Sequence, residues 1–221
     1  MFKTLNMKKI ALPVAILLPL CLAACRKDAS QINGQLREEP LLAGHVLSGS
    51  ADSPVRIEVF SDLECPACRD LFIKIIKPVI AEYQDKVNIV YYEFPLSGHP
   101  YARPAAQYVS VANKLGRKQA FAVYDAIFND QIYWAIDGSL EKSVEKALSA
   151  EDLRKMRQIL LNRASMAEIN ETIDKEYLWG LNKGVNATPT IFISNGGKEQ
   201  KVEGGAPTYQ LLKQFLDPLV K

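Results

Sequence analysis

Residues 54–68 read PVRIEVFSDLECPAC, and both the fold and the chemistry of the chain are predicted from this stretch. The short run Val55–Phe60 follows a proline and predicts a buried strand. From Cys65 to Tyr83 apolar residues recur at helical spacing, which predicts a helix that Pro78 kinks. The sequence therefore places Cys65 and Cys68 where a strand turns into a helix.

A second strand is predicted at Val87–Phe94, which is rich in β-forming residues. A strand, a helix and a strand within about forty residues form a βαβ unit, so these strands should be parallel. The next strand pattern is Thr190–Ser194, and the long segment before it is helical. Ser165 with Glu168 resembles a capping box there. The helical stretches are 105–115, 119–129, 139–148, 151–161 and 165–183.

The end of the chain is predicted to complete the same sheet. Asn195-Gly196 is a hairpin signal between Thr190–Ser194 and Glu199–Val202. A closing helix is expected at Thr208–Val220. The order of elements predicts an α/β domain over 47–221, with a helical subdomain inserted at about 100–184.

The amino terminus resembles a secretion signal. Lys8 and Lys9 precede the apolar stretch Ile10–Leu20, which is shorter than the roughly 20 residues of a membrane-spanning helix. The sequence Leu22-Ala23-Ala24-Cys25 resembles the lipobox of bacterial lipoproteins, in which the cysteine is acylated. We therefore expect a signal peptide at 1–24 and a lipid on Cys25. The alternative is an ordinary cleaved signal in which this cysteine is incidental.

Residues 25–46 are polar and irregular, and they predict a flexible tether between the anchor and the domain. The net charge of +2 does not indicate a nucleic-acid binder, because beyond residue 24 the chain has 24 Lys and Arg against 25 Asp and Glu. Cys21 would leave with the signal, so Cys65 and Cys68 are the cysteines available for chemistry.

A thiol at the start of a helix has a lowered pKa, because helix N–H groups and the helix dipole stabilise its anion. Pro66 fits the first helical turn, where its missing N–H is not needed. We assign Cys65 as the exposed nucleophile and Cys68 as the buried thiol that resolves a mixed disulfide. Competing interpretations are a chance CxxC, half a zinc site with His45 or His99, and a structural disulfide.

Three motifs in order resemble the DsbA-like oxidoreductases of thioredoxin fold. They are PVRIEVFSDLECPAC, the segment FPLSGHP (Phe94–Pro100) and the segment NATPTIFI that contains Thr188 and Pro189. The likeness runs from about Leu47 to the end and includes the helical insertion. It implies that Pro189 is a cis-proline facing the active site, and that the Thr188 backbone pairs with an extended substrate peptide.

Two departures from the family pattern bear on the chemistry. Many relatives have a buried acid six residues before the first cysteine, whereas this chain has Val59. Glu58 is one residue away and should point to the opposite face of its strand, as a solvated or second-face charge, unless a bulge turns it inward. Strongly oxidising relatives have His where this chain has Ala67, so we predict a less acidic Cys65 and a less oxidising disulfide than in DsbA.

His99 is a candidate accessory residue, because its loop follows the second strand and can approach the catalytic face. A structural or solvated role is the alternative. Tyr133, Trp134 and Trp179 are interpreted as packing residues that can also line a substrate groove.

The sequence thus predicts a lipid-anchored enzyme of the bacterial cell envelope, facing the periplasm or extracytoplasmic space, without a metal or an organic cofactor. Its expected partners are thiols or disulfides of exported proteins, a redox partner, and the membrane through the anchor. Oxidase, reductase and isomerase are directions of one chemistry, and the reduction potential and redox partner decide between them. The alternatives are a Cu(I)-binding module with Cys65, Cys68 and His99, or a non-catalytic scaffold.

Overall fold

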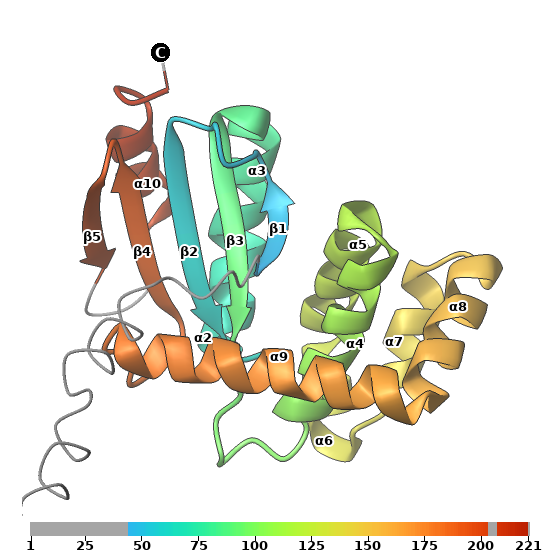
Figure 1. The fold of residues 1–221 in the computed structure, drawn as a ribbon. Helices are drawn as coiled ribbons and strands as arrows, with labels where there is room; N and C mark the ends of the chain where they lie inside the picture. Colours follow the sequence, from blue (N-terminus) through green and yellow to red (C-terminus); the bar gives the residue numbers. More distant parts are fainter. Residues whose placement is uncertain (1–43, 203–206, 221) are drawn as a thin grey trace, which may run out of the picture. The chain divides into compact units, whose positions relative to one another are not determined.

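The computed structural model describes residues 44–202 and 207–220. Within them the strands form one sheet in the order β1-β3-β2-β4-β5 (Figure 1). β2 and β3 are parallel, as the βαβ pattern predicts, whereas the other neighbouring pairs are antiparallel. The strands are β1 (His45–Ser48), β2 (Val55–Ser61), β3 (Val87–Glu93), β4 (Thr190–Asn195) and β5 (Lys198–Val202).

The helix after β2 is irregular, as expected from Pro78, but the irregularity precedes the proline. α2 (Pro66–Leu71) passes into a π-helical turn, η1 (Phe72–Ile76), before α3 (Lys77–Tyr83) continues it. Pro78 lies in the first turn of α3 and has no N–H to donate to the preceding turn. The wider π-helical turn accommodates that missing bond. A short 3₁₀ turn, η2 (Gln84–Lys86), then leads into β3.

The expected helical insertion lies between β3 and β4. Its last helix, α9, extends from the other inserted helices to the sheet (Figure 1). The closing helix is α10 (Tyr209–Leu216). The inserted helices are α4 (Ala102–Leu115), α5 (Arg117–Asn129), α6 (Gln131–Asp137), α7 (Leu140–Ala147), α8 (Ala150–Leu161) and α9 (Arg163–Asn182).

The sheet buries a different apolar cluster on each face. On one face Val59, Cys68 and Phe72 belong to a large core shared with the inserted helices and α10. On the other face Phe60 and its neighbours pack with Tyr177 and Trp179 of α9. Gly180 allows this close approach, because a Cβ there would lie 2.7 Å from a ring carbon of Phe94. The two faces therefore provide two separate environments for polar groups.

Several local predictions differ from the structure. β1 begins at His45, so the last two residues of the predicted tether 25–46 belong to the sheet. Cys25 and the other residues up to 43 lie outside the described residues. α9 is capped by Asn162, whose side chain accepts from the N–H of Ser165, so the capping box predicted at Ser165 is wrong. The helix α6 was not predicted.

Candidate active site

The two cysteines lie at the amino-terminal end of α2, directly after β2. Cys65 is the N-cap residue, with extended backbone angles, and Pro66 follows in the first turn. The thiols are not joined by a disulfide. Cys65 is 8% exposed and Cys68 is fully buried. The predicted asymmetry is present, although Cys65 is more covered than the expectation of an exposed nucleophile.

The Thr188-Pro189 segment lies against the first cysteine. The peptide bond between these residues is cis, as the family resemblance implied. The Cys65 thiol donates to the carbonyl oxygen of Thr188 at 3.5 Å. The fold thus brings together two segments that are separated by the whole helical insertion.

The surroundings of the two sulfurs make them chemically unequal. The hydrogen bond from Cys68, aided by backbone N–H groups of Ala67 and Cys68 and by Thr188, outweighs burial and lowers the pKa of Cys65 from 9.0 to about 5. Burial raises the pKa of Cys68 well above 9.0, and the Cys65 charge adds to this. Near neutral pH the first cysteine is a thiolate and the second remains a thiol, which is the arrangement that disulfide exchange requires.

His99 does lie at the catalytic end of the sheet. Its Nδ1 is 2.8 Å from Oδ2 of Asp62, which is 1% exposed. The same carboxylate accepts from the backbone N–H groups of Leu96 and Glu64, each at 2.7 Å. Asp62 also donates its own N–H to the sulfur of Cys68 at 3.4 Å. One buried carboxylate therefore connects the CxxC turn to the FPLSGHP loop.

Comparison with known proteins agrees with this geometry. A family model described as Thioredoxin matches residues 42–217. The chain belongs to the thioredoxin family. Its fold with a helical insertion is also that of solved DsbA-like proteins. Wolbachia pipientis alpha-DsbA1 superposes with a TM-score of 0.64 at 18% identity, covering 82% of this chain and 92% of that one.

Two further similar proteins are matched over comparable lengths. BdbD from Bacillus subtilis superposes with a TM-score of 0.63 at 17% identity, covering 80% of this chain and 92% of that one. A probable disulfide bond formation protein D from Bacillus cereus is 24% identical over 179 residues, which are 78% of this chain and 77% of that protein. The similarity thus extends over the sheet and the insertion together.

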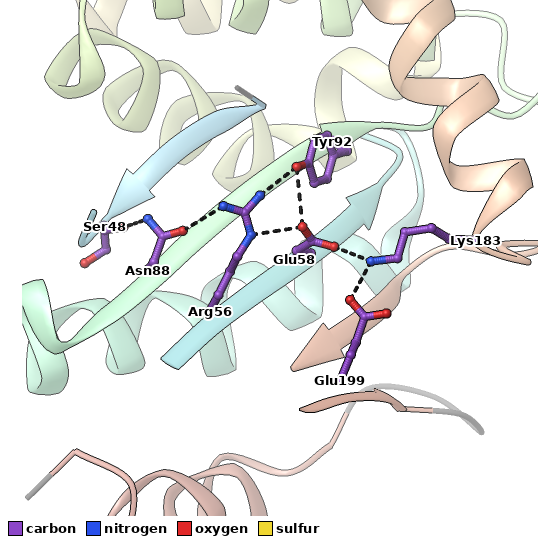
Figure 2. A network of polar contacts seen from close by, with 7 residues as sticks. All are labelled: Ser48, Arg56, Glu58, Asn88, Tyr92, Lys183 and Glu199. Atoms are coloured by element: carbon purple, nitrogen blue, oxygen red, sulfur yellow. Dashed lines mark hydrogen bonds and ion pairs between the residues drawn. The ribbon is translucent and has the colours of Figure 1, made fainter. Parts of the chain in front are cut away.

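This thioredoxin-family chain has a valine where many relatives have a buried acid, and Glu58 does not replace it. Val59 packs in the cluster that contains Cys68, while β2 pairs in unbroken register with both neighbours, so no bulge turns Glu58 inward. Glu58 faces the second side of the sheet, as predicted, but it is buried there at 2% exposed rather than solvated. Arg56 at 2.9 Å and Lys183 at 2.5 Å pair with it (Figure 2).

Gln131 is a site residue that sequence reasoning missed. It is the first residue of α6 and is 3% exposed. Its side-chain NH₂ donates to the carbonyl oxygens of Leu63 at 2.7 Å and Cys65 at 3.0 Å. It therefore holds the turn that presents the nucleophile. No motif marks this glutamine, because its partners lie more than sixty residues away.

The aromatic residues divide into two kinds. Trp134 is buried and donates to the carbonyl of Ile127 at 2.7 Å, which confirms its packing role. Tyr133 on the same helix is 67% exposed, so the packing role predicted for it is wrong.

Among the described residues no group of three or more His, Cys, Asp and Glu is arranged to hold a metal ion. The same part of the chain contains no helix that is long and apolar enough to span a membrane.

Proposed function

We propose that this protein is a thiol–disulfide oxidoreductase that exchanges disulfides with exported proteins through Cys65 and Cys68. The observation that carries the proposal is the pairing of an acidified Cys65 with a fully buried Cys68 at a helix start. Cys65 attacks a substrate disulfide, or is attacked when oxidised, and a mixed disulfide forms. Cys68 then resolves it.

The substrate is proposed to bind as an extended segment beside Thr188 and Pro189. The Thr188 carbonyl already contacts the Cys65 sulfur, so a peptide paired with this backbone would bring its own sulfur to the nucleophile. Pro66 and Ala67 are exposed and form the rest of the surface that such a peptide meets.

The proposed direction is disulfide formation. Stabilising the Cys65 thiolate stabilises the reduced protein, and this makes the corresponding disulfide an oxidant. The Bacillus relatives are named for disulfide bond formation. With Ala67 in place of histidine, we keep the expectation that the disulfide is less oxidising than that of DsbA.

Activity assays of single-cysteine variants test this proposal. In its oxidised form the wild-type protein should refold reduced ribonuclease. In the presence of a dithiol reductant it should reduce insulin. Cys65→Ser should abolish both reactions, whereas Cys68→Ser should accumulate mixed disulfides with the substrate. Ser110→Ala, a buried hydroxyl change in α4, is the matched control. Tight Cu(I) binding without turnover would instead support the copper-binding alternative.

We also propose that Cys25 carries lipid and tethers the domain on the outer side of a bacterial membrane. The proposal is supported by the lysines, apolar stretch and Leu-Ala-Ala-Cys of residues 8–25. Mass spectrometry of the membrane fraction should find an acylated Cys25 as the first mature residue. Cys25→Ala should release the protein from membranes, and an unacylated amino terminus in the wild type would contradict the anchor.

A further inference from the structure

The proposed exchange requires a proton to move at Cys68, and neither the residue at the position of the usual acid nor the neighbouring Glu58 can accept it. Val59 cannot titrate, and Glu58 lies on the opposite face of the sheet in a network with Arg56 and Lys183 (Figure 2). Cys68 is fully buried, so water does not reach its sulfur directly. A proton acceptor must therefore lie inside the core on the Cys68 side.

A buried polar cluster lies on that side, between the sheet and the inserted helices. It consists of His45 from β1, Glu93 from β3, Tyr124 from α5 and Glu176 from α9, and none of these residues is more than 2% exposed. Tyr124 donates to Glu93 Oε1 and its hydroxyl lies 2.6 Å from His45 Nδ1. Glu176 accepts from the backbone N–H of Glu93 at 2.8 Å. Two carboxyl groups and an imidazole thus share one buried site.

Two buried hydroxyls, those of Ser61 and Tyr91, belong to the same face of the sheet as this cluster and influence Cys68 or are influenced by it. Ser61 is paired in register with Glu93, so their side chains leave the same face of neighbouring strands. Tyr91 precedes Glu93 by two residues, and its ring is 6.0 Å from that of Phe72, one helical turn after Cys68. The Ser61 side chain opposes the rise in the pKa of Cys68 that burial causes. Burial raises the pKa of Tyr91, and the charges of Cys68 and Glu93 add to this.

Both hydroxyls are buried, and neither has a hydrogen-bond partner of normal geometry among the described residues. Buried polar groups are almost always paired, so two unpaired hydroxyls beside one thiol need an explanation. A hydroxyl that relays a proton must be free to turn between donor and acceptor. Ser61 and Tyr91 meet that condition, because no hydrogen bond among the described residues fixes the direction of either hydroxyl.

We propose that Glu93 is the proton acceptor and donor for Cys68, that the Ser61 and Tyr91 hydroxyls relay the proton, and that His45, Tyr124 and Glu176 share the charge. This inference rests on the thiol–disulfide exchange proposed above. It assigns to β3 the task that many relatives give to an acid on β2.

The electrostatics of the cluster suit a proton that arrives and leaves near neutral pH. Burial raises the pKa of Glu176 to about 7, with the Glu93 charge adding to this and His45 opposing it. Burial works to lower the pKa of His45, but Glu93 and Glu176 outweigh it and the pKa is raised. The titratable groups that interact with Glu93 are His45, Tyr91, Tyr124 and Glu176. Cys68 is the thiol that the proposed relay connects to it.

The step balances in both directions. When the reduced protein resolves a mixed disulfide, the Cys68 proton passes to Glu93 and the Cys68 sulfur attacks the Cys65 sulfur. The Cys65–Cys68 bond forms, and the bond from Cys65 to the substrate sulfur breaks with its electron pair leaving on the substrate as a thiolate. When a substrate thiolate attacks the oxidised protein at Cys65, Cys68 leaves as a thiolate and takes the proton from Glu93.

Single-turnover reactions with oxidised glutathione separate attack from resolution. The full chain in its reduced form is mixed with glutathione disulfide, quenched with acid and analysed by mass spectrometry between pH 5 and 9. In Glu93→Gln we expect attack by Cys65 to match the wild type. Resolution by Cys68 should slow about tenfold or more at pH 6–7, because the buried thiol has lost its proton acceptor.

Glu58→Gln is the matched control, because Glu58 is equally buried on the other face of the sheet. It should leave the pH profile of resolution unchanged. If Glu93→Gln does not fold, the double variant Ser61→Ala/Tyr91→Phe takes its place, since both lost hydroxyls are unpaired. A wild-type profile of resolution in either folded variant overturns the relay. A wild-type protein whose Cys65 never attacks glutathione disulfide would instead overturn the proposed function.

Discussion

His99 Nδ1 lies 2.8 Å from Oδ2 of Asp62, the residue three positions before the nucleophile Cys65. The contact joins the loop after β3 to the CxxC turn. Burial works to lower the pKa of His99, but the hydrogen bond and charge of Asp62 outweigh it, and the pKa is raised with a contribution from Cys65. The imidazole is therefore more readily charged than a free histidine, close to a thiolate.

Removing that charge should make Cys65 less acidic. Because His99 is protonated below its raised pKa, His99→Ala removes a positive charge that favours the thiolate at pH 5–6. We expect the thiolate fraction at pH 5 to fall about twofold or more, measured by absorbance of the thiolate near 240 nm. Ser97→Ala, an exposed change in the same loop, is the control. An unchanged titration would assign His99 a purely structural role.

The stability of the reduced protein should increase with pH in a defined range. The pKa of Cys65 is lowered to about 5 in the fold against 9.0 for a free thiol, so between these values the unfolded chain binds a proton that the folded chain does not. Stability rises with pH wherever the unfolded state binds more protons. The gain is therefore present above pH 9 and is lost as the pH falls toward 5.

Urea unfolding of the reduced wild type and of Cys65→Ser measures this contribution. The difference in unfolding free energy should grow from pH 5 to 9, with a slope below the limit of about 1.4 kcal/mol per pH unit. The raised pKa values of His45 and His99 affect both proteins and largely cancel in the difference. A difference that stays flat over this range would contradict the acidification of Cys65.

The parts of the site that depend on local sequence patterns could be predicted from the sequence. The strand at 55–61, the helix start at Pro66 and the segment Thr188–Pro189 each have signals within a few neighbouring residues. Gln131 and the Asp62–His99 pair have no such signal, because their partners are distant in sequence. The same is true of Glu58, whose partner Lys183 is 125 residues away, so its burial could not be predicted from a charged residue in a strand.

A substitution at Ala67 can change the reduction potential of the Cys65–Cys68 disulfide without disturbing the fold. It is exposed in the first turn of α2, so a larger side chain there meets solvent. Ala67→His should place a hydrogen-bond donor and a positive charge beside the Cys65 thiolate and lower its pKa below about 5. The reduced form gains stability, and the disulfide becomes a stronger oxidant.

Equilibration with glutathione buffers measures that change. The equilibrium constant for reduction of the disulfide by glutathione should increase about tenfold for each unit by which the thiol pKa falls. Ala67→Gln controls for side-chain size without a full charge. A variant with histidine that equilibrates like the wild type would show that Ala67 does not set the potential.

Lys183 should contribute to stability but not to exchange. Its side chain is 10% exposed, it pairs with Glu58 and Glu199, and its Nζ lies 4.1 Å from the centre of the Phe192 ring (Figure 2). Lys183→Met leaves Glu58 buried with one cation fewer, and we expect a loss of about 3 kcal/mol in urea unfolding. Attack of Cys65 on glutathione disulfide should be unchanged, because the network lies on the other face of the sheet.

The matched control for Lys183 is Lys114→Met, which breaks the exposed pair with Glu168. An exposed ion pair contributes about 0–1 kcal/mol, so this variant should unfold almost as the wild type does. A loss in Lys183→Met no larger than in the control would mean that Arg56 alone neutralises Glu58. A slower attack in a folded Lys183→Met protein would mean that the two faces of the sheet are coupled, because no described contact of Lys183 reaches the cysteines.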